Sequence, residues 1–526
     1  MKTAADTVSP YDEVLYPGTV FPQTHPNRLA TVAFLRGVEP APINRCRVLE
    51  LGCGVGSNLL GMAFQLPESE FIGLDLAQRP IATGQSRVTA LGLRNISLHS
   101  MDVCDASIER FGRFDFIIVH GLYSWVPQPV RERILAVCRE LLNPQGVAYI
   151  SYNAYPGNHL RNLVRWMMRF HMACFDDPTD KIGQARGLLK FLTESAPNPD
   201  YYIAAIRAQY ERVIRYTDEA FYHDDLNEFN QSFYFSEFIL DAERHGLQFV
   251  GEASSNELHP GKYTPAVMKK MDELKGAKEI VREQYKDFIR GCAFRQTLLC
   301  QKEIEVAPDL LVERIPKLFA SCDAAPKEES VGESGQVTLF CRPGGAELET
   351  THPLICAALK ILWSNWPGAV SFEKLLGAAR SEAVGKGFSP SEQDSEILAE
   401  ALSRAYRTGF LNLYVLPYAF TSVASERPSV SKLARYQLEF DECATNQLHV
   451  TMKFPDALSR RLVQLLDGTR DREMLVRELL EFVQSGRGKV MENDVQIEDM
   501  AEVAAILERR VGEGIESLAR EGMLIS

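Results

Sequence analysis

The fold is decided by the stretch Val48-Leu49-Glu50-Leu51-Gly52-Cys53-Gly54-Val55-Gly56-Ser57-Asn58, which Phe71-Ile72-Gly73-Leu74-Asp75 follows one helix later. An apolar strand over 47–51 runs into a glycine turn that opens a helix over 58–66, and a second strand over 70–74 ends on an acid. A strand, a glycine turn, a helix and a strand with a carboxylate at its tip are typical of the nucleoside-binding half of an open α/β sheet. The sequence therefore predicts a cofactor site at this turn.

The glycine spacing selects the cofactor. Dinucleotide folds use G-x-G-x-x-G to seat a pyrophosphate on the helix N-terminus, whereas here the third glycine comes one residue early, as Gly52, Gly54 and Gly56. This turn, with Glu50 two residues before it, suits a ligand with an amino-acid end and a cationic sulfur. Asp75 is placed to bind both ribose hydroxyls. The prediction is S-adenosyl-L-methionine as cofactor and methyl transfer as the reaction.

Later segments complete this sheet. A strand over 96–102 ends on Asp102, which is placed to accept from the adenine amino group, and strands over 113–120 and 147–152 flank a helix over 131–142. The last two strands, 247–253 and 294–301, are displaced downstream of a helix over 236–245. We predict a core of 1–157 with an N-terminal lid, a region 236–303 that completes it, and a helical insert, 158–235. The insert either caps a substrate pocket or forms a dimer interface.

The chain changes character after residue 303. At 526 residues it is long enough for three or four domains. Residues 304–346 include a run that is poor in apolar bulk and predicts a polar linker. Three helices and a strand within 347–420 resemble a winged helix, and acidic side chains around the would-be reading helix favour protein contact over DNA. Residues 430–526 predict a mostly helical C-terminal domain.

Composition limits the partners. A net charge of −13 argues against a nucleic acid as the main substrate, since such binding relies on clustered Lys and Arg. The sequence has no apolar run near the ~20 residues of a membrane span and no basic-then-apolar leader, so we expect a cytoplasmic protein without membrane insertion. Dispersed His and Cys residues support no metal site.

The acceptor should lie where polar and aromatic side chains follow the fourth and fifth strands. Tyr123, Tyr152 and Tyr155 could line a slot for an alkylammonium group through cation–π contacts. His120 is the natural base candidate because its ordinary pKa lies near neutrality, although it equally could end the strand or touch the cofactor. Trp125 is expected on the cofactor or the next helix.

Three sets of site residues result. The catalytic candidates are His120, Tyr123 and Tyr155. The predicted cofactor contacts are Glu50, Gly52, Gly54, Gly56, Asn58, Asp75, Leu76, Met101, Asp102, His120 and Trp125. The predicted substrate or lid residues are Tyr16, Phe21, Gln23, Thr24, His25, Tyr152 and Asn153.

Several motifs carry a family resemblance: Tyr16-Pro17, Phe21-Pro22-Gln23-Thr24-His25-Pro26, Glu50-Leu51-Gly52-Cys53-Gly54, His120-Gly121-Leu122-Tyr123-Ser124-Trp125-Val126-Pro127, Ser151-Tyr152-Asn153-Ala154-Tyr155-Pro156-Gly157 and Phe221-Tyr222-His223-Asp224-Asp225-Leu226. Together they resemble bacterial class I methyltransferases with a methyltransferase regulatory domain. That family includes lysine methyltransferases that act on bacterial outer-membrane proteins. The resemblance implies a Rossmann-like α/β core, an inserted dimerisation element, a middle domain and a C-terminal domain.

The predicted function is N-methylation of lysine side chains in a protein substrate, by in-line methyl transfer, with a homodimer implied by the resemblance. Two alternatives remain at this point: a methyltransferase for a small metabolite, and a regulatory protein that binds S-adenosylmethionine without turnover. The large accessory region, 304–526, speaks mildly against the metabolite.

Overall fold

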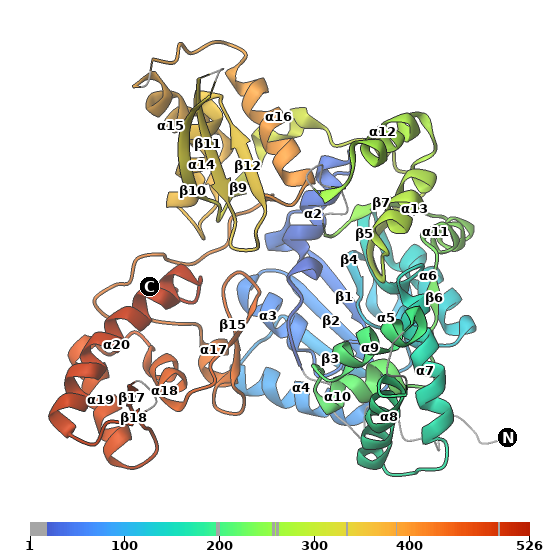
Figure 1. Ribbon diagram of the computed structural model, residues 1–526, viewed down its shortest axis with the longest axis horizontal. Helices are drawn as coiled ribbons and strands as arrows, with labels where there is room; N and C mark the ends of the chain where they lie inside the picture. Colours follow the sequence, from blue (N-terminus) through green and yellow to red (C-terminus); the bar gives the residue numbers. More distant parts are fainter. Residues whose placement is uncertain are drawn as a thin grey trace.

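The computed structural model describes residues 18–195, 200–254, 258, 262–332, 335–385, 387–492 and 495–526. Its centre is an eight-stranded sheet in the order β3-β2-β1-β4-β5-β8-β7, with the short β6 paired to β5 (Figure 1). The strands are β1 (Arg47–Leu51), β2 (Glu70–Asp75), β3 (Ile96–Ser100), β4 (Phe114–Val119), β5 (Leu142–Ala154), β6 (Ser232–Phe233), β7 (Leu247–Glu252) and β8 (Phe294–Gln301). Strands β1 to β5 are parallel, and β8 lies antiparallel between β5 and β7. The predicted Rossmann-like core is confirmed, including its two displaced strands.

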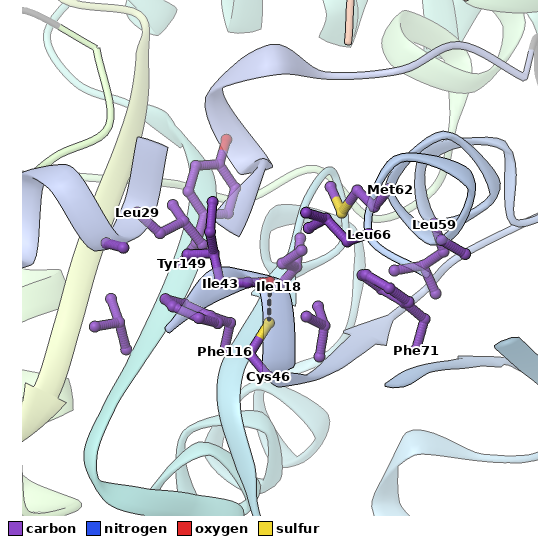
Figure 2. Close-up of a cluster of buried hydrophobic side chains, with 14 of the residues drawn as sticks. Leu29, Ile43, Cys46, Leu59, Met62, Leu66, Phe71, Phe116, Ile118 and Tyr149 are labelled. Atoms are coloured by element: carbon purple, nitrogen blue, oxygen red, sulfur yellow. Dashed lines mark hydrogen bonds between the residues drawn. The ribbon is translucent and has the colours of Figure 1, made fainter. Parts of the chain in front are cut away.

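Helices cover both faces of this sheet. One face packs against α2 (Pro26–Leu35), α3 (Ser57–Gln65) and α4 (Gln78–Leu91), and the other against α5 (Ile108–Phe111), α6 (Gln128–Leu141) and α11 (Phe235–Arg244). Figure 2 shows the first cluster, in which Leu29 of α2 and Met62 of α3 lie over Phe116, Ile118 and Tyr149 of the sheet. Buried side chains of this size contribute roughly 1.5–3 kcal/mol each, so the paired clusters hold the strand ends in place.

Strand alternation assigns the side chains of β5 to opposite faces. Tyr149 belongs to the cluster under α2 and α3, whereas Ile150 and Tyr152 belong to the cluster under α6 and α11. Adjacent residues of a strand point to opposite faces, so Tyr149 and Tyr152 lie three positions apart on different sides of the sheet. Only one of these two tyrosines can therefore lie on the same face of the sheet as α2 and α3, and it is Tyr149.

The insert is helical, as predicted. It contains α7 (Asn158–Met172), α8 (Pro178–Thr193), α9 (Tyr201–Val213), α10 (Asp218–Phe221) and a π-helical turn, Tyr222–Leu226. Side chains cap three of these helices: Asp177 for α8, Asp200 for α9 and Thr217 for α10. The chain then returns to the sheet through β6 and α11.

The region that completes the core is tied by a buried charge cluster. After α12 (Pro265–Glu273) and α13 (Glu279–Arg290), Arg295 of β8 is only 1% exposed. Its guanidinium pairs with Glu252 of β7 and with Glu283 and Asp287 of α13. Because a buried cation needs such partners, this cluster fixes α13 against the last two strands.

The prediction of a polar linker over 304–346 is wrong. This range holds a 3-10 turn, Val312–Lys317, and the strands β9 (Phe319–Ser321), β10 (Ala325–Gly332) and β11 (Gly335–Cys341). The polar composition was misleading because β10 and β11 pair through their backbones, and a hairpin requires little apolar bulk when one residue, here Phe340, anchors it in the core.

The middle domain therefore begins earlier than residue 347. It adds β12 (Glu347–Thr350), α14 (Pro353–Ser364), β13 (Val370–Ser371), α15 (Phe372–Val384), α16 (Asp394–Arg407) and β14 (Asn412–Tyr414) to the strands above. Strand β9 lies between β13 and β14, and the three helices follow in the predicted order. The domain packs against α2 through β14.

The C-terminal domain lies beside α3 and α4 (Figure 1). It consists of α17 (Lys432–Gln437), β15 (Cys443–Thr445), β16 (Thr451–Lys453), α18 (Ala457–Leu465), α19 (Arg472–Gln484), β17 (Met491–Glu492), β18 (Val495–Gln496) and α20 (Met500–Arg520). The domain is mostly helical, as predicted, and the β15–β16 hairpin adds to its helices. Lys432 donates to the carbonyls of Ala90 and Leu91 at the end of α4. In the parts of the chain given above, no helix is long and apolar enough to span a bilayer.

Candidate active site

The glycine turn between β1 and α3 has an open side. Gly52, Gly54 and Gly56 have φ values of 76°, 54° and 71°, which residues with a side chain rarely adopt. A Cβ on Gly56 would lie 2.8 Å from Leu98, so this glycine is required by packing, whereas a Cβ on Gly54 would meet nothing within 4 Å. The backbone of Gly54 is thus open to close approach by a ligand.

Asp75 closes the turn from the tip of β2. Its Oδ2 accepts from the N–H of Gly54 at 2.8 Å and its Oδ1 from the N–H of Ala77 at 2.9 Å. The neighbouring Leu76 is 64% exposed and Met101 is half-buried, so both offer apolar surface beside the carboxylate. Asp102 is exposed, and its Oδ1 accepts from the N–H of Cys104.

Glu50 is a buried carboxylate beneath the same turn. It is 4% exposed, and its Oε1 accepts from Nδ2 of Asn58 at 2.9 Å. Its Oε2 is buried and has no hydrogen-bond partner among the residues that the structure describes. Burial raises the pKa of Glu50 to about 8, and the nearby Asp75 acts in the same direction, while the bond from Asn58 opposes them. The site therefore contains a carboxylate oxygen that lacks a donor.

The N-terminal segment packs against the start of α3, beside this turn. The N–H of Phe21 donates to Oδ1 of Asn58 at 3.0 Å, and the Thr24 hydroxyl donates to the Phe21 carbonyl and accepts from Nδ2 of Asn58. Phe21 packs its ring on His120, with 3.9 Å between centroids. His25 is buried and caps α2. Tyr16, the remaining residue of the expected lid, lies outside the described residues.

His120 lies at the end of β4 and pairs with a residue that the sequence analysis missed. Its Nδ1 is 2.9 Å from the hydroxyl of Tyr149 on β5, which also interacts with Gln23. Burial lowers the pKa of His120 to about 4, so the ring is neutral near pH 7. Gly121 follows, and its N–H donates to the Ser151 hydroxyl. The alternation of β5 could have indicated Tyr149, because Ile150 and Tyr152 form the apolar face.

Tyr123 and Tyr152 lie elsewhere than expected. They are 2% and 1% exposed and pack with Phe233 and Phe238 in the cluster under α6 and α11. The Tyr152 hydroxyl bonds to Thr297. Both rings were expected to line a slot for the acceptor, and this prediction is wrong. Their positions on the strand and in the turn direct them into the core, where they pack under the end of the sheet.

Tyr155 does lie near the surface, beyond the end of β5. Its hydroxyl accepts from Nδ2 of Asn162 at 3.0 Å, and its ring stacks on His159 at 4.1 Å. Asn153 bonds to Asn230, whose segment pairs with β5 through β6. Trp125 is half-buried. The predicted acceptor residues thus come together from β4, β5, the insert and the segment before α11 only in part, because Tyr123 and Tyr152 lie in the core.

Three family models match consecutive parts of the chain: a methyltransferase domain over 48–146, a predicted methyltransferase regulatory domain over 217–301 and the C-terminal winged helix domain of PKMT over 426–523. Uncharacterized protein RP789 of Rickettsia prowazekii is 30% identical over 99% of this chain and 95% of its own length. The chain belongs to the bacterial class I methyltransferases that carry a methyltransferase regulatory domain. It is an S-adenosylmethionine-dependent enzyme.

A solved structure is similar to this protein over nearly its whole length. PKMT2 from Rickettsia typhi, in complex with AdoHcy, superposes with a TM-score of 0.85 at 26% identity, and the match covers 97% of this chain and 100% of that one. A second protein of Rickettsia prowazekii, RP028, is 39% identical over 46% of this chain. The match to PKMT2 includes the middle and C-terminal domains.

The residues present fit S-adenosylmethionine on chemical grounds. The cofactor carries an ammonium group, and Glu50 Oε2 is a buried acceptor for which the described residues provide no donor. It also carries a ribose, for which Asp75 offers a carboxylate at the strand tip beside the open face of Gly54. Charge-assisted bonds of this kind are stronger than neutral ones.

Proposed function

We propose that this methyltransferase N-methylates lysine side chains of a protein substrate. Bound S-adenosylmethionine supplies an electrophilic methyl group on a sulfonium. The enzyme must then hold a neutral amine in line with that methyl and keep water away.

The extent of the family match supports a protein acceptor and carries the proposal. The ubiquinone biosynthesis O-methyltransferase of Acinetobacter baumannii, a relative named for a small-molecule pathway, is 26% identical over only 22% of this chain. PKMT2, by contrast, matches nearly the whole chain, with both accessory domains. The middle domain packed on α2 and the C-terminal domain packed on α3 and α4 add a large accessory surface, which suits a protein acceptor better than a metabolite.

We assign the cofactor contacts to one half of the sheet edge. Glu50 holds the ammonium group, with Asn58 orienting its other oxygen. Asp75 binds the ribose hydroxyls, Leu76 and Met101 flank the adenine, and Asp102 accepts from its amino group. The Phe21 ring closes the pocket over His120.

We assign the acceptor to the other half, at His120, Tyr149 and Tyr155. A neutral His120 adds no positive charge beside a sulfonium and an amine. With a pKa of about 4, it is a poor acceptor for the proton of an ammonium, whose ordinary pKa is about 10.4. The lysine proton therefore leaves to water before transfer, and the hydrogen-bonded pair of His120 and Tyr149 orients the free amine.

We further propose a homodimer formed through the insert. Several of its aromatic side chains are exposed although they are apolar: Trp166 at 70%, Phe170 at 74%, Phe191 at 67% and Tyr201 at 89%. Trp166 and Phe170 stack on each other along α7. Exposed apolar clusters on helical elements mark interfaces. Trp166→Glu should shift the particle mass in solution from two chains to one.

The substrate class is tested by labelling. The enzyme is incubated with methyl-labelled S-adenosylmethionine and cell lysate, with Asp75→Ala as the matched inactive control. Protease-sensitive label that survives base treatment, and that disappears when lysines are acylated beforehand, is expected. Acid-soluble label would replace the proposal with a metabolite acceptor, and absence of any label above the control would favour binding without turnover.

A further inference from the structure

The C-terminal domain inserts one side chain into the cofactor half of the site. His449 lies in the loop between β15 and β16 and is completely buried. Its Nε2 is 3.0 Å from Oδ1 of Asn58, at the start of α3, although the two residues are 391 positions apart. The ring also fills the space over Gly61, where a Cβ would lie 2.9 Å from it.

The loop holds this histidine rigidly. His449 is the non-glycine residue with a positive φ, 57°, in the described parts of the chain. The side chain of Asn446 accepts from the N–H groups of Leu448 and Val450 and donates to the carbonyl of Glu521 at the end of α20. Gln65 of α3 donates to the Asn446 carbonyl. A backbone held in this sparsely populated region indicates a functional constraint.

The hydrogen bonds around Asn58 fix the direction of its amide. Its Nδ2 donates to Glu50 Oε1 and to the Thr24 hydroxyl, whose own hydrogen goes to the Phe21 carbonyl. Its Oδ1 accepts from the N–H of Phe21, which can only donate. His449 Nε2 therefore carries a hydrogen and donates to the same oxygen. Without this donor, nothing on the C-terminal side opposes rotation of the amide away from Glu50.

We propose that His449 is a positioning residue for cofactor binding: through Asn58 it sets the orientation of Glu50 toward the amino-acid end of S-adenosylmethionine. The C-terminal domain thereby completes the cofactor site of the core. The inference rests on the assignment of Glu50 to the cofactor ammonium under the proposed function.

The test uses the full-length enzyme and His449→Phe, which keeps the ring and removes the donor. We expect the Kd for AdoHcy and the KM for S-adenosylmethionine to rise roughly tenfold, the equivalent of one buried hydrogen bond, with kcat within about twofold of wild type. His449→Gln, whose amide N–H can replace Nε2, should restore most of the affinity.

Lys432→Met is the matched control. It removes another contact between the C-terminal domain and the core, the bonds from Lys432 to the carbonyls of Ala90 and Leu91, without touching Asn58. It should lower the Tm and leave the Kd unchanged. Equal effects of His449→Phe and Lys432→Met on the Kd would overturn the proposal, because domain docking alone would then explain them.

Two more variants separate the possible failures. Gly61→Ala displaces the ring from α3 and should reproduce the loss of affinity if His449→Phe does not fold. Glu50→Gln tests the underlying assignment. If Glu50→Gln binds AdoHcy as wild type does, the proposed cofactor placement fails; if it loses affinity and His449→Phe does not, only the role of His449 fails.

Discussion

The two halves of the sheet edge are built in different ways. At the ends of β1 and β2, the turn, Glu50, Asn58 and Asp75 come from a single βαβ unit and bond directly to one another. At the ends of β4 and β5, His120 and Tyr149 meet Phe21 and Gln23 from the N-terminal segment, and Phe294 from β8. The cofactor half is thus built around one local unit, to which Phe21, Thr24 and His449 add contacts at Asn58, whereas the proposed acceptor half is assembled throughout from distant parts of the chain.

Asp75→Ala should have the largest effect, because it removes the carboxylate assigned to the ribose and the acceptor that holds the N–H of Gly54. We expect the affinity for AdoHcy to fall at least about 100-fold, or roughly 3 kcal/mol, as for a buried charged hydrogen bond. Isothermal titration calorimetry measures the Kd for AdoHcy of both proteins. Unchanged affinity would show that the cofactor half is not the local unit described above.

Glu50 should make cofactor affinity dependent on pH. Because its pKa is raised to about 8, the free enzyme carries this proton below pH 8, and a bound ammonium requires the carboxylate. Binding should therefore release a proton, and affinity should increase from pH 6 to pH 8, by at most about tenfold per unit, and level off above.

Titrations in buffers of different ionisation enthalpy measure the released proton directly. Glu50→Gln should abolish both the release and the pH slope. A slope that persists in this variant would assign the linkage to another group and leave Glu50 without a role in binding.

Tyr149→Phe should affect catalysis without affecting cofactor binding. It removes the bond to His120, and we expect kcat to fall about tenfold at an unchanged Kd for AdoHcy, because orientation of the amine is lost. Tyr152→Phe is the control from the opposite face of the same strand. It loses the bond to Thr297, should lower the Tm and should leave kcat unchanged. Equal kcat in the two variants would contradict the division of β5 into a catalytic and a structural face.

Tyr155→Phe should give the smallest effect. The hydroxyl accepts only from Asn162 in the described contacts, and the ring, stacked on His159, is retained. We expect kcat to fall about two- to threefold, as for a single partly buried hydrogen bond, with cofactor affinity intact. An equal loss of kcat and of cofactor affinity would instead assign Tyr155 to the cofactor half.

The sequence predicts what is local. The strand, the glycine turn and the acid of β2 lie within 30 residues and have strict spacing, so the core and its cofactor follow from them. Three helices between residues 347 and 420 and a helical C-terminal domain were also predicted, because their apolar residues repeat at helical spacing.

Three features were missed, each for a different reason. Tyr149 was missed because the polar residues of Ser151-Tyr152-Asn153 indicated Tyr152 as the site residue of β5. Alternation along β5 places Tyr149 and Tyr152 on opposite faces of the sheet. His449 could not be found at all, since no local pattern relates it to Asn58, and only the packing of the C-terminal domain brings them together. The hairpin in 304–346 was missed because its strands pair through backbone groups, which leave little trace in composition.

The place of β8 has a consequence for synthesis. Strand β5 lies between β4 and β8, so its outer edge stays unpaired until Phe294 has emerged from the ribosome, long after Ala154. At 5–20 residues per second, the interval is roughly 7 to 30 s. Throughout it, the nascent chain presents an open and largely apolar strand edge, a known site of misassembly. The insert, whose buried core extends from Val164 to Leu226, emerges within this interval.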